Sequence, residues 1–555
     1  MESQRFALFF VFAFSVFFLL DGWHKDQRPV TPAEPSGAVS SGSGAEVKPA
    51  PSPGTAPAAV PGAASVPSSA VGSEVTTKGE TIRVETDVYV AEISTVGGDF
   101  RKLELKAHKD PVDKSRSMVL FQSTPEHTYI AQSGLVGAGL PNHRTLYSAK
   151  ERNFSLAPGQ DKLEVRLEAA SGGVALAKVY RFSRGSYLID VVQEITNQGA
   201  APIQPFEYLQ LVRDNVPPPG DSAMLPTFTG AAVYTEKEKF HKIPFADVDK
   251  NKASYPKSST DGWVAMLQHY FFSAWLPPSN TNREFFVRKL DGNLYAAGLI
   301  LPRATIAPGA TDSMTIPLYA GPQEQDRLSK LAPGLDLTVD YGWLTVIAVP
   351  LFWVLSWIHE WVGNWGIAII LLTVLIKLLF YPLSEASYRS MAKMRVVAPK
   401  LQKLKEQYGD DRQRMQQAMM ELYKREKINP LGGCLPIVVQ IPVFIALYWV
   451  LLASVELRQA PFFGWITDLS TPDPWYILPV LMGISMIVQT RLNPEPPDPV
   501  QAKVMKIMPV AFSVFFFFFP AGLVLYWLVN NVLSILQQWH INRLLESDKS
   551  VPKKA

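Results

Sequence analysis

Polar and apolar residues alternate along much of the chain between residues 79 and 330. The period of two is clear from Thr81 to Val90, from Lys162 to Leu167 and from Tyr187 to Val192. Such alternation is typical of strands that bury one face and leave the other in water. Glycine-containing turn signals separate the short runs. The pattern therefore predicts an antiparallel β-sandwich over residues 79–330.

Long apolar runs replace this alternation after residue 336. Residues 336–362 carry four tryptophans, which favour the headgroup level of a bilayer, so we expect an interfacial amphipathic helix there. Residues 363–545 then hold five apolar runs of about the length needed to cross or nearly cross ~30 Å of hydrocarbon, which predicts a bundle of five core transmembrane helices. The expected spans are Trp365–Tyr381, Cys434–Ala453, Trp475–Val488, Ile507–Phe519 and Ala521–Gln538.

The N-terminal region divides into two parts. Phe6 to Leu20 is apolar apart from Ser15, and no small-residue cleavage site follows it directly. We interpret residues 1–24 as a transmembrane signal anchor, with a cleaved signal peptide as the alternative. Residues 25–78 are rich in Pro, Ala, Ser and Gly. Such a composition cannot bury enough apolar surface to fold, so we expect a disordered linker.

Basic residues set the expected topology. Ser384 to Ile428 carries eleven Lys or Arg against six Asp or Glu, which places this segment in the cytoplasm by the positive-inside rule. The loop from Ser454 to Pro474 holds one Arg and three acids and therefore belongs outside. The same alternation puts the tail at 546–555 in the cytoplasm and the β-domain on the far side of the membrane.

Overall charge and motifs narrow the classes of function. The 555-residue chain has a net charge of +3, which gives no general attraction to nucleic acid, and we expect no DNA partner. Its single cysteine, Cys434, allows no intrachain disulfide. The sequence shows no nucleotide-binding or hydrolase motif. We therefore expect a non-enzymatic protein with no catalytic residue, no cofactor and no metal.

Lys377 is the most informative residue because it interrupts an apolar run. A cation at the centre of a span costs roughly 2.5–3.5 kcal/mol on translocon scales and usually marks a functional site. Thr373 lies one turn earlier on the same face, and Gln440 and Asn530 also fall at membrane depth. We expect these four residues to line a polar substrate groove. The alternatives are that Lys377 snorkels to the headgroups and that the others only join neighbouring helices.

The cytoplasmic segment 384–428 has apolar residues at helical spacing on both sides of Gly409-Asp410-Asp411. This spacing predicts two amphipathic helices joined by a turn, an αα-hairpin. Methionines on these helices offer an adaptable surface for varied apolar partners, or they pack the two helices together. The candidate contact residues are Met391, Met394, Met415 and Met419.

A motif at the start of the second expected span is similar to that of a known family. Asn429-Pro-Leu-Gly-Gly-Cys-Leu-Pro436, with the segment that follows to Tyr448, resembles the signature of the YidC/Oxa/Alb insertases. Further matches are Gly363–Gly366, Tyr381–Leu383, Met391–Met394, Val455–Pro461 and Phe519–Tyr526. The anchor, linker and large β-domain resemble the Gram-negative form, whose exported domain is a β-supersandwich similar to sugar-mutarotase folds.

The resemblance implies an insertase that inserts, folds and helps assemble inner-membrane proteins, with a periplasmic β-domain and a cytoplasmic C-terminus. In this family a groove open to cytoplasm and lipid holds a cation that attracts acidic residues of the substrate. Arginine is usual there, so Lys377 keeps the charge but loses the planar fork. The implied contacts to nascent chains are Phe444, Met482, Phe515 and Trp527. Implied partners are nascent membrane proteins, the ribosome, the Sec translocon and the bilayer.

Two other functions are open from the residues alone. A small-anion transporter or channel would use Lys377 as its binding charge, but transporters commonly show paired repeats, and none is evident in the sequence. A membrane-tethered carbohydrate-active enzyme would need paired carboxylates or a His–Glu pair in the β-domain, and the sequence alone places neither.

Overall fold

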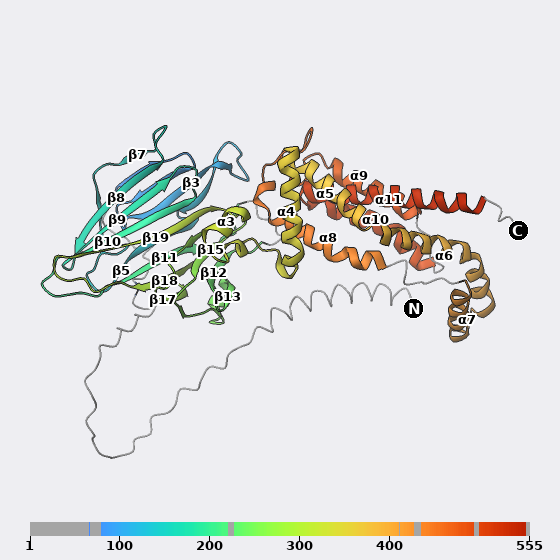
Figure 1. The fold of residues 1–555 in the computed structure, drawn as a ribbon, viewed down its shortest axis with the longest axis horizontal. Helices are drawn as coiled ribbons and strands as arrows, with labels where there is room; N and C mark the ends of the chain where they lie inside the picture. Colours follow the sequence, from blue (N-terminus) through green and yellow to red (C-terminus); the bar gives the residue numbers. More distant parts are fainter. Residues whose placement is uncertain are drawn as a thin grey trace, which may run out of the picture.

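The protein has a β-sandwich lobe and a helical lobe (Figure 1). The computed structural model describes residue 66 and residues 79–219, 227–409, 411–426, 435–492 and 499–550. The expected anchor at 1–24, the expected linker at 25–78 apart from residue 66, and residues 551–555 lie outside this range.

A ten-stranded sheet forms one layer of the β-domain. Its described pairings are antiparallel except for the parallel pair β1–β7. In spatial order it contains β14 (Ser258–Ser259), β17 (Arg283–Lys289), β18 (Leu294–Pro302), β11 (Phe206–Asp214), β5 (Thr128–Val136), β4 (Ser117–Ser123), β3 (Asp99–Lys109), β2 (Tyr89–Ser94), β1 (Thr81–Glu85) and β7 (Asn153–Ser155).

A nine-stranded antiparallel sheet forms the second layer, and the predicted antiparallel sandwich is thereby confirmed. In β8, Leu163, Val165 and Leu167 are buried while the residues between them are exposed, as the period of two requires. In spatial order the sheet contains β13 (Lys239–Pro244), β12 (Gly230–Thr235), β15 (Trp263–Leu267), β16 (Phe271–Trp275), β19 (Thr311–Pro322), β10 (Leu188–Asn197), β9 (Val174–Ser183), β8 (Lys162–Ser171) and β6 (Ser148–Ala149).

Buried tyrosines tie the two sheets together through their hydroxyl groups. The Tyr89 hydroxyl of β2 donates to the Ala320 carbonyl of β19 at 2.5 Å. The Tyr129 hydroxyl of β5 donates to the Met266 carbonyl of β15 at 2.9 Å. Each ring fills the apolar layer while its polar end is satisfied, so the core accepts these hydroxyls without an unpaired group.

Short helices connect the sandwich to α4 (Thr345–Val362). They are α3 (Gln325–Leu331), η2 (Leu335–Thr338) and η3 (Gly342–Leu344). The remaining short helix, α2 (Phe245–Asp249), lies between β13 and β14 within the β-domain. Figure 1 shows α4 crossing the ends of the longer core helices instead of running alongside them. Four tryptophans are largely exposed around it: Trp343, Trp353, Trp357 and Trp361. An apolar surface of this kind fits the predicted interfacial helix.

The helical lobe holds the apolar runs of the second half of the chain. Its helices are α5 (Trp365–Leu379), α6 (Tyr381–Tyr408), α7 (Arg412–Arg425), α8 (Leu435–Ala453), α9 (Ile477–Leu492), α10 (Pro499–Phe515) and α11 (Ala521–Ser550), with short η5 (Val455–Leu457) and η6 (Phe516–Phe518). The expected αα-hairpin is present as α6 and α7, at the end of the lobe farthest from the β-domain (Figure 1).

Length and hydropathy mark fewer spans than the five expected. Among the described residues, Gly342–Val362 is the one helix long and apolar enough to cross a membrane alone. Trp365–Leu379 and Tyr381–Ser390 pass together as a pair bent by 63°. Shorter apolar stretches are Val439–Ala453, Ile477–Leu492 and Lys506–Phe518. The count of five core spans therefore stays a prediction.

The β-domain docks on the helical lobe through the loop after α8, at what we call the junction. The Gln459 side chain accepts from the Lys109 amide at 3.1 Å and donates to the Lys109 carbonyl at 2.9 Å. The Arg458 guanidinium lies 5.3 Å from the centre of the Phe271 ring. His269 Nε2 lies 3.0 Å from the Leu452 carbonyl oxygen. Residues of the β-domain and of the helical lobe therefore contact each other directly at the junction.

Candidate functional site

Lys377 lies near the C-terminal end of α5. This helix begins cleanly because the Asn364 side chain accepts from the Ile367 amide at 3.0 Å, an N-cap. A cation in the last turn faces the negative end of the helix dipole, which is a favourable place for it. Lys377 is half-buried, and its ammonium donates to the Ser534 hydroxyl of α11 at 2.8 Å.

A connected set of polar side chains surrounds this ammonium, and we call it the core polar network: Lys377, Ser534, Asn530 and Gln440. The Ser534 hydroxyl donates to the Asn530 carbonyl at 2.7 Å. Gln440 of α8 donates from Nε2 to Asn530 Oδ1 at 3.0 Å. The network therefore joins α5, α8 and α11, and three of the four expected groove residues lie in it.

Thr373, the fourth expected groove residue, is bonded elsewhere. Its side chain is 1% exposed, and its hydroxyl donates to the Ile369 carbonyl one turn earlier at 2.6 Å. This bond satisfies the hydroxyl within α5, which is common for threonine in membrane helices. Thr373 thus packs beside the network without a bond into it that the structure records.

A second group of polar side chains joins α9 to α11. Asn531 donates to the Ser485 hydroxyl at 2.8 Å, and Gln489 donates to the Gln538 side-chain oxygen at 3.1 Å. Gln538 in turn donates to the Leu492 carbonyl at 3.1 Å. Together with the core polar network, these bonds place amide and hydroxyl groups along one side of α11. Sequence analysis missed Ser534, which a one-turn spacing from Asn530 would have suggested.

Two of the expected apolar contact residues, Phe444 and Phe515, lie around a third, Trp527 of α11. Phe444 of α8 stacks on its ring, with centroids 5.4 Å apart and planes at 7°. Phe515 is half exposed and contacts Phe519, which packs edge-on against Trp527. Met482 of α9 is buried. Phe444 and Trp527 thus form one aromatic cluster in which Trp527 is buried, and the half-exposed Phe515 lies at its edge; we call these three residues the aromatic surface.

An ion pair joins the two helices of the hairpin, and one of its described methionine side chains is exposed. Lys400 of α6 lies 2.7 Å from Glu426, just after α7. Met415 and Met419 are half-buried, which fits packing between the helices, whereas Met420 is 53% exposed. A hollow of about 390 Å³ on α7 is lined by Gln413, Gln417, Met420, Glu421 and Lys424. The side chains of Met391 and Met394 lie outside what the structure describes.

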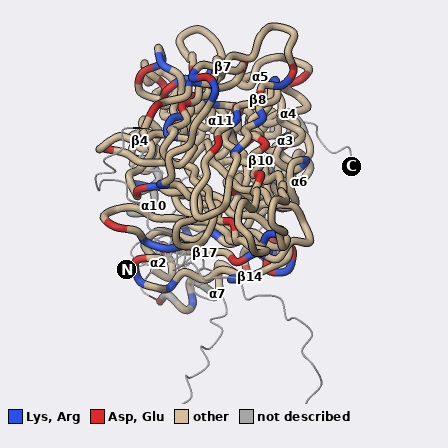
Figure 2. The backbone as a smooth tube through the Cα atoms, turned by 90° about the vertical axis from the view of Figure 1, so that its left-hand side faces the viewer, with Lys and Arg blue, Asp and Glu red and all other residues tan. Residues whose placement is uncertain are grey.

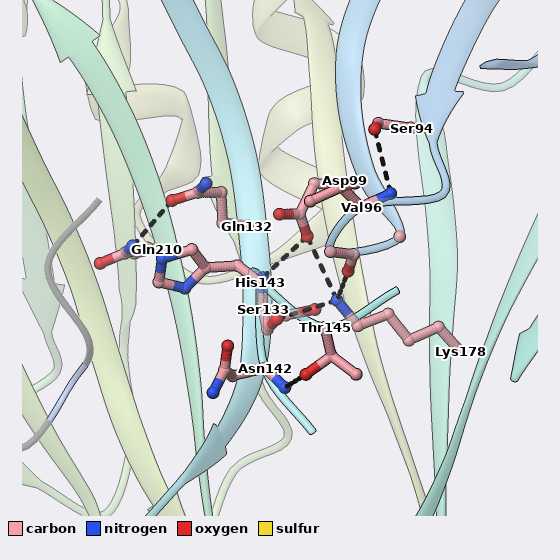
Figure 3. Close-up of polar contacts among 12 residues, drawn as sticks. Ser94, Val96, Asp99, Gln132, Ser133, Asn142, His143, Thr145, Lys178 and Gln210 are labelled. Carbon is pink, nitrogen blue, oxygen red and sulfur yellow. Dashed lines mark hydrogen bonds and ion pairs between the residues drawn. The ribbon is translucent and has the colours of Figure 1, made fainter. Parts of the chain in front are cut away.

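Buried ion pairs in the β-domain form a separate polar centre. Lys178 of β9 reaches across to Asp99 of β3 at 3.2 Å and donates to the Ser133 carbonyl of β5 at 2.8 Å (Figure 3). Burial raises the pKa of Asp99 and lowers the pKa of Lys178. Neither side chain reaches solvent, so this centre joins the sheets and offers no open site.

Two further pairs lie in the β-domain that the sequence alone did not place. His127 Nδ1 lies 2.8 Å from Asp214, and Arg303 lies 2.8 Å from Glu207 with both side chains enclosed. The partners are 87 and 96 residues apart, so no spacing pattern identifies them. Along the backbone that faces the viewer in Figure 2, Lys and Arg positions are interspersed with Asp and Glu positions.

Comparison with known proteins connects both lobes to one family. The family described as the YidC periplasmic domain matches residues 81–354, and the family described as 60Kd inner membrane protein matches residues 357–549. The chain is 56% identical to "Membrane protein insertase YidC" of Nitrosospira multiformis, over all of both chains.

A second relative with the same name also matches nearly the whole chain. "Membrane protein insertase YidC" of Nitrosomonas europaea is 56% identical over 98% of this chain and 91% of its own length. Among solved structures, an active YidC insertase crystal structure with the first transmembrane domain resolved aligns over 83% of this chain and 92% of that chain, with 18% identity and a TM-score of 0.38.

Proposed function

This chain belongs to the YidC family of membrane protein insertases, and we propose that it inserts apolar segments of nascent proteins through a polar groove beside the core polar network. The observation that carries this groove is the half-buried ammonium of Lys377, hydrogen-bonded to Ser534 among apolar helices. The anion-transporter reading has no support in relatives that match the full chain and are named insertases.

The groove acts on the polar end of a substrate. Polar side chains from α5, α8 and α11 replace part of the water that an exported tail must lose, which lowers the barrier to its passage. The Lys377 cation attracts acidic residues of that tail in a medium of reduced dielectric. The charge therefore favours entry of a carboxylate without fixing its orientation, because an ammonium lacks the planar fork of arginine.

The aromatic surface of Phe444, Phe515 and Trp527 acts on the apolar segment of the substrate. A segment that passes along it leaves water and enters lipid, and each Å² of apolar surface removed from water contributes roughly 25 cal/mol. A span that buries on the order of a thousand Å² gains tens of kcal/mol by this arithmetic. Insertion by this route therefore needs no nucleotide hydrolysis.

The remaining partners follow from charge and placement. The hairpin carries most of the basic residues of segment 384–428, and such a surface suits anionic headgroups or ribosomal RNA. It would lie in the cytoplasm and receive the nascent chain from the ribosome, with the β-domain in the periplasm and the Sec translocon as a neighbour. The family relationship supports these partners.

Reconstitution tests the proposed function directly. The purified protein, in vesicles of bacterial phospholipid, should protect the span and tail of a single-span substrate from added protease. Vesicles that contain Lys377→Glu protein at equal density are the matched control for an acidic-tailed substrate. Equal protection in vesicles without the protein would overturn the proposal.

A further inference from the structure

The Ser534 hydroxyl accepts a hydrogen bond from the Lys377 ammonium, and its own hydrogen is donated to another acceptor. A hydroxyl has one hydrogen and two acceptor lone pairs. The Ser534 hydrogen goes to the Asn530 carbonyl at 2.7 Å, four residues earlier on α11. The lone pairs are therefore left to accept, and Lys377 Nζ occupies one of them at 2.8 Å.

The Asn530 side chain extends this set to a third helix. Its Oδ1 accepts from Gln440 Nε2 of α8 at 3.0 Å. Asn530 and Ser534 lie one turn apart on α11, so α5, α8 and α11 meet at two neighbouring turns of that helix.

A lysine needs such an acceptor more than an arginine does. Its ammonium sits at the end of a flexible stem and can swing toward the headgroups, where hydration is better. The Ser534 hydroxyl oxygen, 2.8 Å from Lys377 Nζ, keeps the charge at the depth of Ser534 instead. A hydrogen bond to a charged group is stronger than one between neutral groups, so a single hydroxyl has a measurable effect.

We propose that Ser534 is the positioning residue for the Lys377 cation, setting the depth at which that charge meets an acidic substrate tail. The proposal rests on the proposed function of Lys377 in the groove. Ser534 itself touches no reacting group; it acts through the ammonium that it orients.

The test compares two substrates that share one span and differ in an acidic or a neutral exported tail. In vesicles, Ser534→Ala should lower insertion of the acidic-tailed substrate about tenfold, the effect expected on losing a charge-assisted hydrogen bond. Insertion of the neutral-tailed substrate should stay within about twofold. Ser534→Thr keeps the hydroxyl and should restore the acidic-tailed substrate. The matched control is Ser513→Ala in α10. Like Ser534, Ser513 donates its hydroxyl hydrogen to the carbonyl four residues earlier, that of Pro509.

Three outcomes separate this proposal from its rivals. Equal loss of both substrates in Ser534→Ala would mean a structural role and would overturn it. If Lys377→Ala selectively impairs the acidic-tailed substrate and Ser534→Ala does not, the positioning role is wrong while the groove function stands. If Lys377→Ala has no selective effect, the function proposed for the cation is itself wrong.

A second readout measures the position of the ammonium without insertion. A water-soluble amine reagent, added to the full chain in vesicles, acylates lysines at rates that peptide mass spectrometry can follow. Ser534→Ala should raise the acylation rate of Lys377 several-fold relative to lysines of the β-domain. An unchanged rate would contradict the positioning role.

Discussion

Lys377 carries its charge at the end of a flexible stem, so the surrounding groups decide where that charge acts. The structure gives it a hydroxyl acceptor on α11 and no carboxylate partner among the described residues. A substrate carboxylate would therefore be its first opposite charge. At about 4 Å and an effective dielectric constant near 20, that attraction is worth up to about 4 kcal/mol before desolvation is subtracted.

Lys377→Arg should keep insertion, and Lys377→Glu should abolish insertion of acidic-tailed substrates. Arginine preserves the charge, whereas glutamate turns attraction into repulsion, which predicts a loss of roughly a hundredfold or more. Protease protection in vesicles measures both, with a neutral-tailed substrate as the internal reference. Normal insertion of the acidic tail by the Glu variant would remove Lys377 from the mechanism.

Glu456 gives the junction a dependence on pH. Burial, with Glu324 and Asp326 of α3 nearby, raises its pKa to about 7 from an ordinary 4.5. One of its oxygens has no hydrogen-bond partner among the described residues. The folded protein thus keeps this proton between pH 4.5 and 7 while the unfolded chain loses it. The free energy of unfolding falls across that window by at most about 3 kcal/mol and then levels off.

Glu456→Gln should therefore stabilise the protein at pH 7.5 by a few degrees in Tm and change it little at pH 4.5. The variant must be compared with wild type at each pH, because His269 at the junction also makes stability depend on pH. Burial lowers the pKa of His269 to about 4, so its contribution to stability changes with pH in the opposite direction to that of Glu456. Its contribution is lost as pH falls from about 6.5 through 4 in both proteins. Thermal melting in detergent gives the difference, and exposed Glu126→Gln is the control. A difference that does not vary with pH would contradict the assignment.

How far single residues could be predicted depends on the distance between partners in the sequence. Lys377 stands out because a cation in an apolar run is costly wherever it points. The Lys178–Asp99 pair does not stand out, since 79 residues separate its members and each resembles an ordinary strand residue. The same holds for Gln459 and Lys109, which meet only once two lobes have folded and docked.

Helices and strands were predicted where one periodicity dominates a segment. The apolar run of α5 fixed that helix nearly to its ends, whereas the alternation recognised from Lys162 to Leu167 continues in β8 as far as Ser171. The last expected span ended at Gln538, whereas the helix that contains it, α11, continues to Ser550. Its backbone bonds are made within the helix, so it extends into polar sequence after the apolar run has stopped. Similarly, α10 begins at Pro499, several residues before the expected span.

The hairpin should act early, in receiving the substrate. Its base is anchored, because Ser384 and Ser387 of α6 are buried, whereas most of α7 faces solvent. Replacing residues 396–428 with a short Gly-Ser linker should leave the helical lobe folded and reduce insertion several-fold. Circular dichroism and thermal melting check the fold, and protease protection measures the insertion.

The order of contacts tests the same role in the intact chain. Photocrosslinkers at positions 394 and 415 should capture a ribosome-bound nascent chain at shorter chain lengths than one at position 515. A crosslinker at the exposed Trp343, near the β-domain, is the control and should capture none of the early chains. Normal insertion without residues 396–428, or crosslinks in the reverse order, would make the hairpin a structural lid.

The β-domain and the groove are separate in sequence but docked in space. The core polar network and the aromatic surface lie on α5, α8, α10 and α11, whereas the described junction contacts use Leu452 at the end of α8 and the loop that follows it. Lys114 adds an ion pair to Asp468 at 3.7 Å. The β-domain therefore contributes to holding this loop in place.

Removing residues 80–322 should keep insertion of a small single-span substrate within about twofold of wild type. The deletion ends at the last strand and keeps α3 and everything after it. It should also lower the Tm of the helical lobe, because the Gln459–Lys109 bonds, the Arg458–Phe271 contact and the His269 contact are lost. The same deletion combined with Lys377→Glu is the control, and its failure with an acidic-tailed substrate would show that the remaining activity uses the groove. A truncated protein that melts cooperatively but inserts nothing would make the β-domain essential to the basic reaction.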